Sequence, residues 1–290
     1  MRNLLFLPIL FFALAPLGKG SAFTTTVFQN EVQIIRNLIF GSEGGEKQLL
    51  DLYLPTTEEA LRPAIVFIHG GGWSGGDKGG WAKQAEEMAK LGYVAISINY
   101  RLAPKHKYPA AVIDSQGAVR WLKINSEKYR IDPERIGSMG DSAGGHLAAM
   151  LGVRETYPNS APKDAFSSKV NCVVDYYGRM DLVLSGGAHD YRPDFIGKSL
   201  PEGETLYREA SPITYVSKTS APFLIVQGAR DPQVEPEQSY KMIEALDRAG
   251  VEATLIVISK QGHGFSGVYS DEAWSAAKGF FSQRLMSKKH

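Results

Sequence analysis

Short apolar runs recur along the chain, and stretches of helical length separate most of them. A continuous apolar run between turn residues is typical of a strand that is buried on both faces of a sheet. Strands of this kind are predicted at 64–68, 93–99, about 136–139, 170–176, 223–226 and 255–258. Helices are predicted at 81–90, 109–126, from 143 onward, 236–250 and 271–285. Strands that alternate with helices predict an α/β fold with a doubly wound, mostly parallel sheet.

Two further segments complete this outline. Residues 32–40 and 48–53 read as strands on either side of Gly41–Gly45, which predicts a hairpin-like opening. The segment 178–220 is the least regular part of the chain, and a loop of that length in a compact domain is often a lid or a binding loop. No repeat or change of composition marks a second domain, so one domain is expected over residues 23–290.

The N-terminus has the pattern of a targeting segment. Arg2 precedes an almost wholly apolar run from Leu4 to Leu17, and the small residues Gly20-Ser21-Ala22 suit cleavage after Ala22. Residues 1–22 are therefore predicted to be a signal peptide, and the mature protein is expected to be secreted or periplasmic, without stable insertion in a membrane. The alternative is an uncleaved anchor, although the run is short for a membrane span.

The charge and the cysteine content exclude some classes of protein. Lys and Arg number 32 and Asp and Glu number 31, giving a net charge of +1, which offers no reason to expect nucleic-acid binding. Cys172 is the single cysteine, so the core must hold the chain together without disulfides. Because it lies in an apolar run, we expect its thiol to be buried and inert.

The stretch Gly140-Asp141-Ser142-Ala143-Gly144 has the pattern G-x-S-x-G. A predicted strand precedes it and an apolar, helix-forming segment follows it. This context is typical of a nucleophile elbow, in which a sharp turn leaves the serine hydroxyl exposed and small residues prevent collisions around it. Ser142 is therefore the candidate nucleophile.

A serine hydroxyl needs a neighbouring base to become reactive. Asp231 and His263 each lie on the loop after a predicted buried strand, and the order Ser, Asp, His is the one expected of α/β-hydrolases. Alternatives stay open. His146, one helical turn after Ser142, is more typical of a packed histidine, and Asp175 and Asp181 compete with Asp231 for the role of orienting acid.

His69 and the glycines at 70–72 follow the strand at 64–68. Such a glycine run can present backbone N–H groups to a developing oxyanion, together with the N–H of Ala143. Trp73 comes next and is predicted to contact the substrate. A second G-x-S-x-G around Ser74 does not lie between a strand and a helix. A G-x-G-x-x-G from Gly70 follows two earlier strands rather than the first, and the next strand ends in Asn99 instead of an acid, which excludes a dinucleotide site. No metal and no cofactor are expected, because no metal-ligand spacing occurs.

These motifs together resemble the α/β-hydrolase superfamily, and most closely its hormone-sensitive-lipase-like esterases. The matching stretches are 69–73, 140–145, 228–231 and 262–264, with 100–104 and 211–213 also similar. The resemblance implies Ser142 as nucleophile, His263 as base and Asp231 as orienting acid, with oxyanion donors at Gly71, Gly72 and Ala143. The segment 73–78 is similar to acetylxylan and feruloyl esterases and to arylformamidases. The large N-terminal cap of hormone-sensitive-lipase relatives is not expected.

The sequence thus predicts a secreted serine carboxylesterase that hydrolyses short-chain acyl esters. Its substrate is expected to be a small ester or an ester on a polysaccharide, with acetyl or feruloyl as the acyl group. The alternatives are an amidase or peptidase of the same fold, similar to arylformamidases, and a binding protein that retains the fold without catalysis.

Overall fold

A computed structural model describes residues 25–29, 32–57, 61–155, 166–184 and 190–286. The predicted signal peptide at 1–22 lies outside these residues. The strands are β1 (Thr25–Gln29), β2 (Val32–Gly41), β3 (Gln48–Pro55), β4 (Arg62–Ile68), β5 (Val94–Ile98), β6 (Ile131–Asp141), β7 (Cys172–Tyr176), β8 (Phe223–Gly228) and β9 (Ala253–Ile258). The helices are α1 (Ala82–Lys90), α2 (Ala110–Ile124), α3 (Ser126–Tyr129), α4 (Ala143–Val153), α5 (Arg192–Ile196), α6 (Leu200–Glu209), α7 (Glu237–Arg248) and α8 (Val268–Phe281).

The described strands form one sheet in the order β1-β2-β3-β5-β4-β6-β7-β8-β9. The pairs from β5 to β9 are all parallel, whereas β1, β2 and β3 add an antiparallel edge. The predicted α/β class with a doubly wound, mostly parallel sheet is therefore confirmed. The apolar runs that predicted buried strands correspond to β4 through β9.

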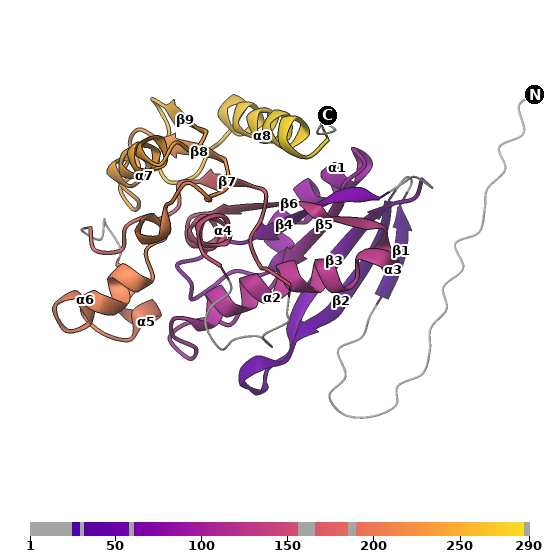
Figure 1. The fold of residues 1–290 in the computed structure, drawn as a ribbon, viewed down its shortest axis with the longest axis horizontal. Coiled ribbons are helices and arrows are strands. Elements are labelled where there is room, and N and C mark those ends of the chain that lie inside the picture. Colours follow the sequence, from indigo (N-terminus) through magenta and orange to yellow (C-terminus); the bar gives the residue numbers. More distant parts are fainter. Residues whose placement is uncertain (1–24, 30–31, 58–60, 156–165, 185–189, 287–290) are drawn as a thin grey trace, which may run out of the picture.

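Helices cover both faces of this sheet, as Figure 1 shows for α1 and α8 on one side and α2 on the other. One core cluster includes Met88 of α1 and Phe281 of α8. The other includes Leu147 of α4 and Met242 of α7, and it also receives α2. Burying both faces of the sheet explains why its central strands contain continuous apolar runs, such as Ala64–Ile68 in β4, rather than alternating apolar and polar residues.

The carboxyl ends of the parallel strands lie at one edge of the sheet. Ile68 at the end of β4 is in register with Gly140 in β6, and Gly228 at the end of β8 is in register with Ile258 of β9. The loops after β4, β6, β8 and β9 therefore emerge side by side. Ligands of open α/β sheets bind at this edge.

Three local predictions need correction. The segment 178–220 is more regular than expected, because it contains the short helices α5 and α6. β1 was not predicted. β6 begins at Ile131 rather than near Ile136, because Ile131 pairs with Arg62 and a register shift separates this pair from the rest of the ladder. The described residues that precede β2 form a single element, β1.

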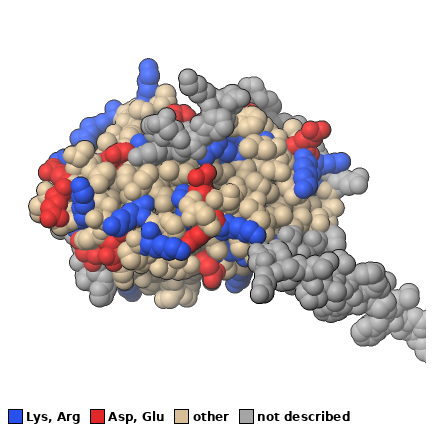
Figure 2. Space-filling model, turned by 90° about the horizontal axis from the view of Figure 1, so that it is seen from below, with Lys and Arg blue, Asp and Glu red and all other residues tan. Residues whose placement is uncertain are grey.

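Two further observations concern the core and the surface. Cys172 is fully buried, and burial raises the pKa of its thiol, in agreement with an inert cysteine. Figure 2 shows acidic and basic side chains interspersed over one face of the molecule. Among the described helices, none has the length and apolar character needed to cross a membrane.

Candidate active site

Ser142 occupies the turn between β6 and α4 in a strained conformation, with φ of 52° and ψ of −118°. Such a conformation costs about 1–3 kcal/mol and persists only where the surroundings enforce it. The neighbouring glycines show how. A Cβ on Gly144 would lie 2.1 Å from the carbonyl oxygen of Ile68, and one on Gly140 would lie 2.3 Å from the backbone of Gly144. The elbow predicted from G-x-S-x-G is therefore present.

The structure brings together the three side chains that the sequence proposed. The Ser142 hydroxyl lies 3.0 Å from Nε2 of His263 and can donate its proton there. Nδ1 of the same imidazole lies 2.8 Å from Oδ2 of Asp231 and donates to that carboxylate. The imidazole thus bridges the hydroxyl and the carboxylate, which is the arrangement that allows a histidine to act as a base.

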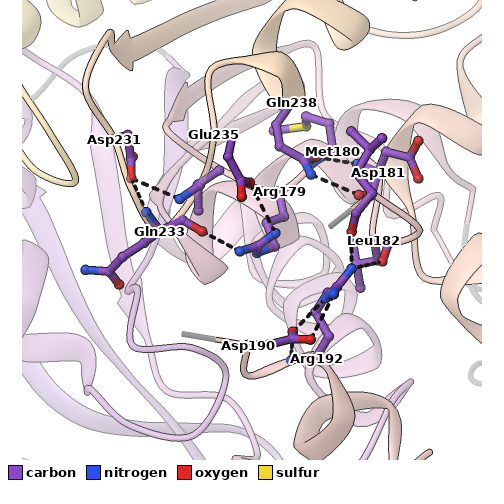
Figure 3. Close-up of polar contacts among 12 residues, drawn as sticks. Arg179, Met180, Asp181, Leu182, Asp190, Arg192, Asp231, Gln233, Glu235 and Gln238 are labelled. Atoms are coloured by element: carbon purple, nitrogen blue, oxygen red, sulfur yellow. Dashed lines mark hydrogen bonds and ion pairs between the residues drawn. The ribbon is translucent and has the colours of Figure 1, made fainter. Parts of the chain in front are cut away.

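The Asp231 carboxylate, which is almost fully buried, is held by groups that the sequence did not indicate. Its Oδ1 accepts the backbone N–H groups of Gln233 at 2.8 Å and Val234 at 2.9 Å (Figure 3). Its Oδ2 also lies 3.3 Å from the amide nitrogen of Gln227. Gln227 is fully buried and donates to the carbonyl of Val234 as well, so it fixes both the acid and its loop.

A second layer of polar side chains supports the Asp231 loop from the segment after β7. Arg179, which is 5% exposed, donates to the carbonyl of Gln233 and lies 4.0 Å from the Glu235 carboxylate (Figure 3). Gln238 at the start of α7 accepts the N–H groups of Met180 and Asp181. These contacts join two loops that are about 50 residues apart in sequence. The local sequence of either loop gives no indication that the two loops are in contact.

The predicted oxyanion donors line the same cavity as Ser142. Gly71 and Gly72 have φ of 111° and 59°, and no hydrogen bond of the described residues occupies their N–H groups. Ala143 is the first residue of α4, so its N–H precedes the first bond within the helix. The loop is anchored at Gly70, whose N–H donates to Oδ1 of Asp141 at 3.0 Å. Burial raises the pKa of this Asp141 carboxyl.

Trp73 lines the cavity of Ser142, but most of its contacts lie inside the protein. Its side chain is 2% exposed, and its ring stacks on Phe195 of α5 at 4.5 Å between centroids. Its indole N–H donates to Nδ1 of His146 at 3.1 Å, and Nε2 of His146 lies 2.7 Å from the carbonyl oxygen of Ala210. His146 must therefore be neutral, with its proton on Nε2, and it joins three segments.

The alternative residues take other positions. His146 is fully buried between Trp73 and Ala210, away from the role of base. Oδ1 of Asp175 accepts the N–H of Gly178, and Asp181 accepts the N–H of Val183. His69 donates from Nδ1 to the carbonyl of Gly70 and stacks on a tyrosine of the next loop. Among the described residues, none of these side chains makes a hydrogen bond, ion pair or ring contact with His263.

The cavity above Ser142 has a volume of about 440 Å³. Its walls come from the oxyanion loop, the elbow, the loops carrying Asp231 and His263, and the side chains of Tyr177, Arg179 and Tyr191. Tyr191 packs over Gly72, where a Cβ would approach its ring to 2.7 Å. This size is within the range of small-molecule sites. Among the described residues, no group of three or more His, Cys, Asp or Glu side chains could hold a metal ion.

His146 should make stability depend on pH. Burial lowers its pKa from 6.5 to about 4, so between these values the unfolded chain binds a proton that the folded chain excludes. Stability conferred by the neutral imidazole is complete above pH 6.5 and is lost as the pH falls toward 4, by about 3 kcal/mol in total. Urea unfolding of the parent and of His146→Gln at pH 7, 5.5 and 4 measures this. The difference in unfolding free energy between the parent and His146→Gln should become smaller as the pH falls. A difference that stays constant with pH would contradict the assignment.

Comparison with known proteins adds to this geometry. Esterase LipC of Mycobacterium tuberculosis is 30% identical over 245 residues, which are 79% of this chain and 59% of LipC. A solved structure described as a truncated form of a carbohydrate esterase from gut microbiota is 29% identical, with a TM-score of 0.73, and the match covers 88% of this chain and 96% of that one. Butyrate-bound esterase Est2 of Thermogutta terrifontis is 25% identical with a TM-score of 0.75, over 87% and 96% of the two chains.

The chain spans about half the length of the curated relatives it matches, among them LipC, LipQ and LipM. The family assignment has a broader basis, because a sequence model described as BD-FAE matches residues 50–246. This segment extends from within β3 to within α7 and includes Ser142 and Asp231. Since the match extends over more than half of the chain, the protein belongs to the BD-FAE family, within the α/β-hydrolase superfamily.

Proposed function

We propose that the protein is a serine carboxylesterase that hydrolyses short-chain acyl esters. The observation that carries the proposal is the position of the His263 imidazole, 3.0 Å from the Ser142 hydroxyl and 2.8 Å from the Asp231 carboxylate. In this role Ser142 attacks the ester carbonyl while His263 takes its proton, and Asp231 keeps the imidazole in the required tautomer. Three of the proteins compared above carry the name esterase, which supports this reaction type.

The remaining steps use groups on the walls of the same cavity. The oxygen that becomes negative is stabilised by the N–H groups of Gly71, Gly72 and Ala143, and one such donor is typically worth about 3 kcal/mol in the transition state. His263 then protonates the leaving alcohol, and a water molecule, deprotonated by the same imidazole, releases the acid and restores Ser142. No step in this sequence needs a metal ion or an organic cofactor.

For the substrate we propose acetyl or other short acyl esters, including acetyl and feruloyl esters of polysaccharides. A cavity of about 440 Å³ that is lined by Trp73 and Tyr191 favours a compact acyl group over a long chain. Similarity to a carbohydrate esterase from gut microbiota and to an esterase that holds butyrate supports the same choice.

The proposal includes export from the cytoplasm with removal of residues 1–22. Mass spectrometry of the protein recovered from the periplasm or medium should then find Phe23 as the first residue. Recovery of a chain that retains the apolar segment 4–17 in every fraction would contradict it.

Removal of the Ser142 hydroxyl tests the proposed nucleophile. Ser142→Ala should lower kcat for 4-nitrophenyl acetate by about a millionfold, because no other group forms the acyl-enzyme. The control is Ser74→Ala, which alters the second G-x-S-x-G in the same cavity and removes only a 3.4 Å contact with the carbonyl of Gly71, so it should lose far less activity than Ser142→Ala. A Ser142→Ala protein within tenfold of the parent would refute the assignment.

Gln227 should affect turnover through Asp231. Gln227→Met removes the buried amide that contacts Asp231 and Val234 while keeping the side-chain length, so the acid is held less accurately and kcat should fall about 10-fold to 100-fold. The matched control is Gln116→Met, which removes another fully buried glutamine amide in α2. Both variants should lose unfolding free energy, but only the first should lose kcat per folded molecule. Equal kcat values in the two variants would contradict a positioning role for Gln227.

A further inference from the structure

A second cavity of about 550 Å³ lies next to the one that contains Ser142. The two cavities share Gly71, Asp141 and Tyr177 as wall residues. The second one extends from there toward α1 and the first turn of α8, and it contains neither Ser142 nor His263. We call it the aromatic cavity, because its walls include the rings of Trp81, Tyr176, Tyr177, Phe265 and Trp274.

The rings form a continuous wall that starts at the proposed base. Tyr177 packs edge-to-face on the His263 imidazole with centroids 4.8 Å apart, and Phe265 packs on Tyr177 at 5.0 Å. Tyr176 follows Phe265 at 5.5 Å, and Trp81 follows Tyr176 at 6.1 Å. This wall therefore connects the imidazole to the interior of the aromatic cavity.

The position of the wall indicates which half of an ester the aromatic cavity receives. The leaving alcohol must lie next to Nε2 of His263, because that nitrogen returns the proton. Tyr177, which packs on the imidazole, and Phe265, which packs on Tyr177, line the aromatic cavity, whereas Gly72, Trp73 and Ala143 line only the cavity of Ser142. The acyl group then occupies the cavity of Ser142, and the alcohol half extends along the rings.

The chemistry of the walls indicates the kind of alcohol. The polar side chains of Gln84 and Ser270 line the aromatic cavity, and in the described structure they make no hydrogen bond or ion pair. An apolar alcohol would remove these groups from water without replacing their hydrogen bonds, which is unfavourable. A pyranose offers C–H faces for the rings and hydroxyl groups for the amide and the serine. Rings together with a few placed polar groups are typical of small-molecule sites.

We propose that the aromatic cavity binds a pyranose ring of the alcohol half, so that the substrate is an acylated saccharide recognised through Gln84 and Ser270. This inference rests on the proposed esterase function. It adds a site on the side of His263 that is remote from the acyl group, and it assigns the choice of alcohol to α1 and the start of α8.

The test compares saccharide esters with an ester whose alcohol is too small to reach the aromatic cavity. The probes are acetylated oligosaccharides of xylose, glucose and galactose, with ethyl acetate as the reference and acetate release as the readout. The variant is the double substitution Gln84→Ala and Ser270→Ala. Its matched control is Ser275→Ala with Gln283→Ala, which changes the same residue types on exposed positions at the C-terminal end of the chain that line neither cavity.

The parent should hydrolyse at least one of the three saccharide esters with a higher kcat/KM than ethyl acetate. The Gln84 and Ser270 variant should lose about tenfold in kcat/KM on that saccharide ester, the effect of about two neutral hydrogen bonds, and stay within threefold on ethyl acetate. The control variant should match the parent on both. The proposal is overturned if no saccharide ester exceeds ethyl acetate, or if the variant loses the same factor on both esters or on neither.

Binding separates a failure of this inference from a failure of the proposed function. Ser142→Ala protein should bind the preferred acetylated oligosaccharide in calorimetry, and the Gln84 and Ser270 substitutions should weaken that binding by about tenfold. If the parent hydrolyses no ester but this binding is found, the esterase proposal is wrong and the saccharide site stands. If ethyl acetate is hydrolysed but no saccharide binds, the esterase proposal stands and the saccharide site is wrong.

Discussion

Direct contact between backbones determines the geometry of the site. The end of β4 and the first turn of α4 approach so closely that a Cβ on Gly144 would lie 2.1 Å from the carbonyl oxygen of Ile68 and 2.6 Å from that of His69. The distance between the Ser142 hydroxyl and the N–H groups of Gly71 and Gly72 is therefore set by main chain rather than by flexible side chains. Rigid placement of this kind is what preorganised stabilisation of an oxyanion requires.

Buried polar side chains fix the loops that follow the carboxyl ends of the parallel strands. Asp141 accepts from Gly70, His146 joins Trp73 to Ala210, and Gln227 joins Asp231 to Val234. Asp141 and His146 satisfy groups on other segments, whereas Gln227 satisfies groups on the loop that follows its own strand. A buried polar group is costly when its partner moves away, so each of these contacts favours one arrangement of the loops. These contacts thereby join the loop after β4 to β6 and α4, and they fix the loop after β8.

The sequence indicated the site through the ends of strands. Apolar runs located β4, β6, β8 and β9, and parallel strands end at one edge, so the meeting of Ser142, Asp231 and His263 could be predicted from short patterns. Arg179 and Gln227 could not, because their partners are backbone groups of loops whose path depends on the whole fold. The helices α5 and α6 were missed for a related reason, since they are short and owe their stability to packing on the rest of the domain.

In this proposal the cavity of Ser142 binds the acyl group and the aromatic cavity binds the alcohol half. Tyr177 stands between them, packed on the imidazole and in contact with both spaces. The oxyanion loop, Arg179 and Tyr191 bound the space beside Ser142, whereas α1 and the first turn of α8 bound the other. Residues on these loops and helix ends can change without moving the strands that carry Ser142, Asp231 and His263. A fold built in this way can keep one reaction while the preferred acyl group and the preferred alcohol vary separately.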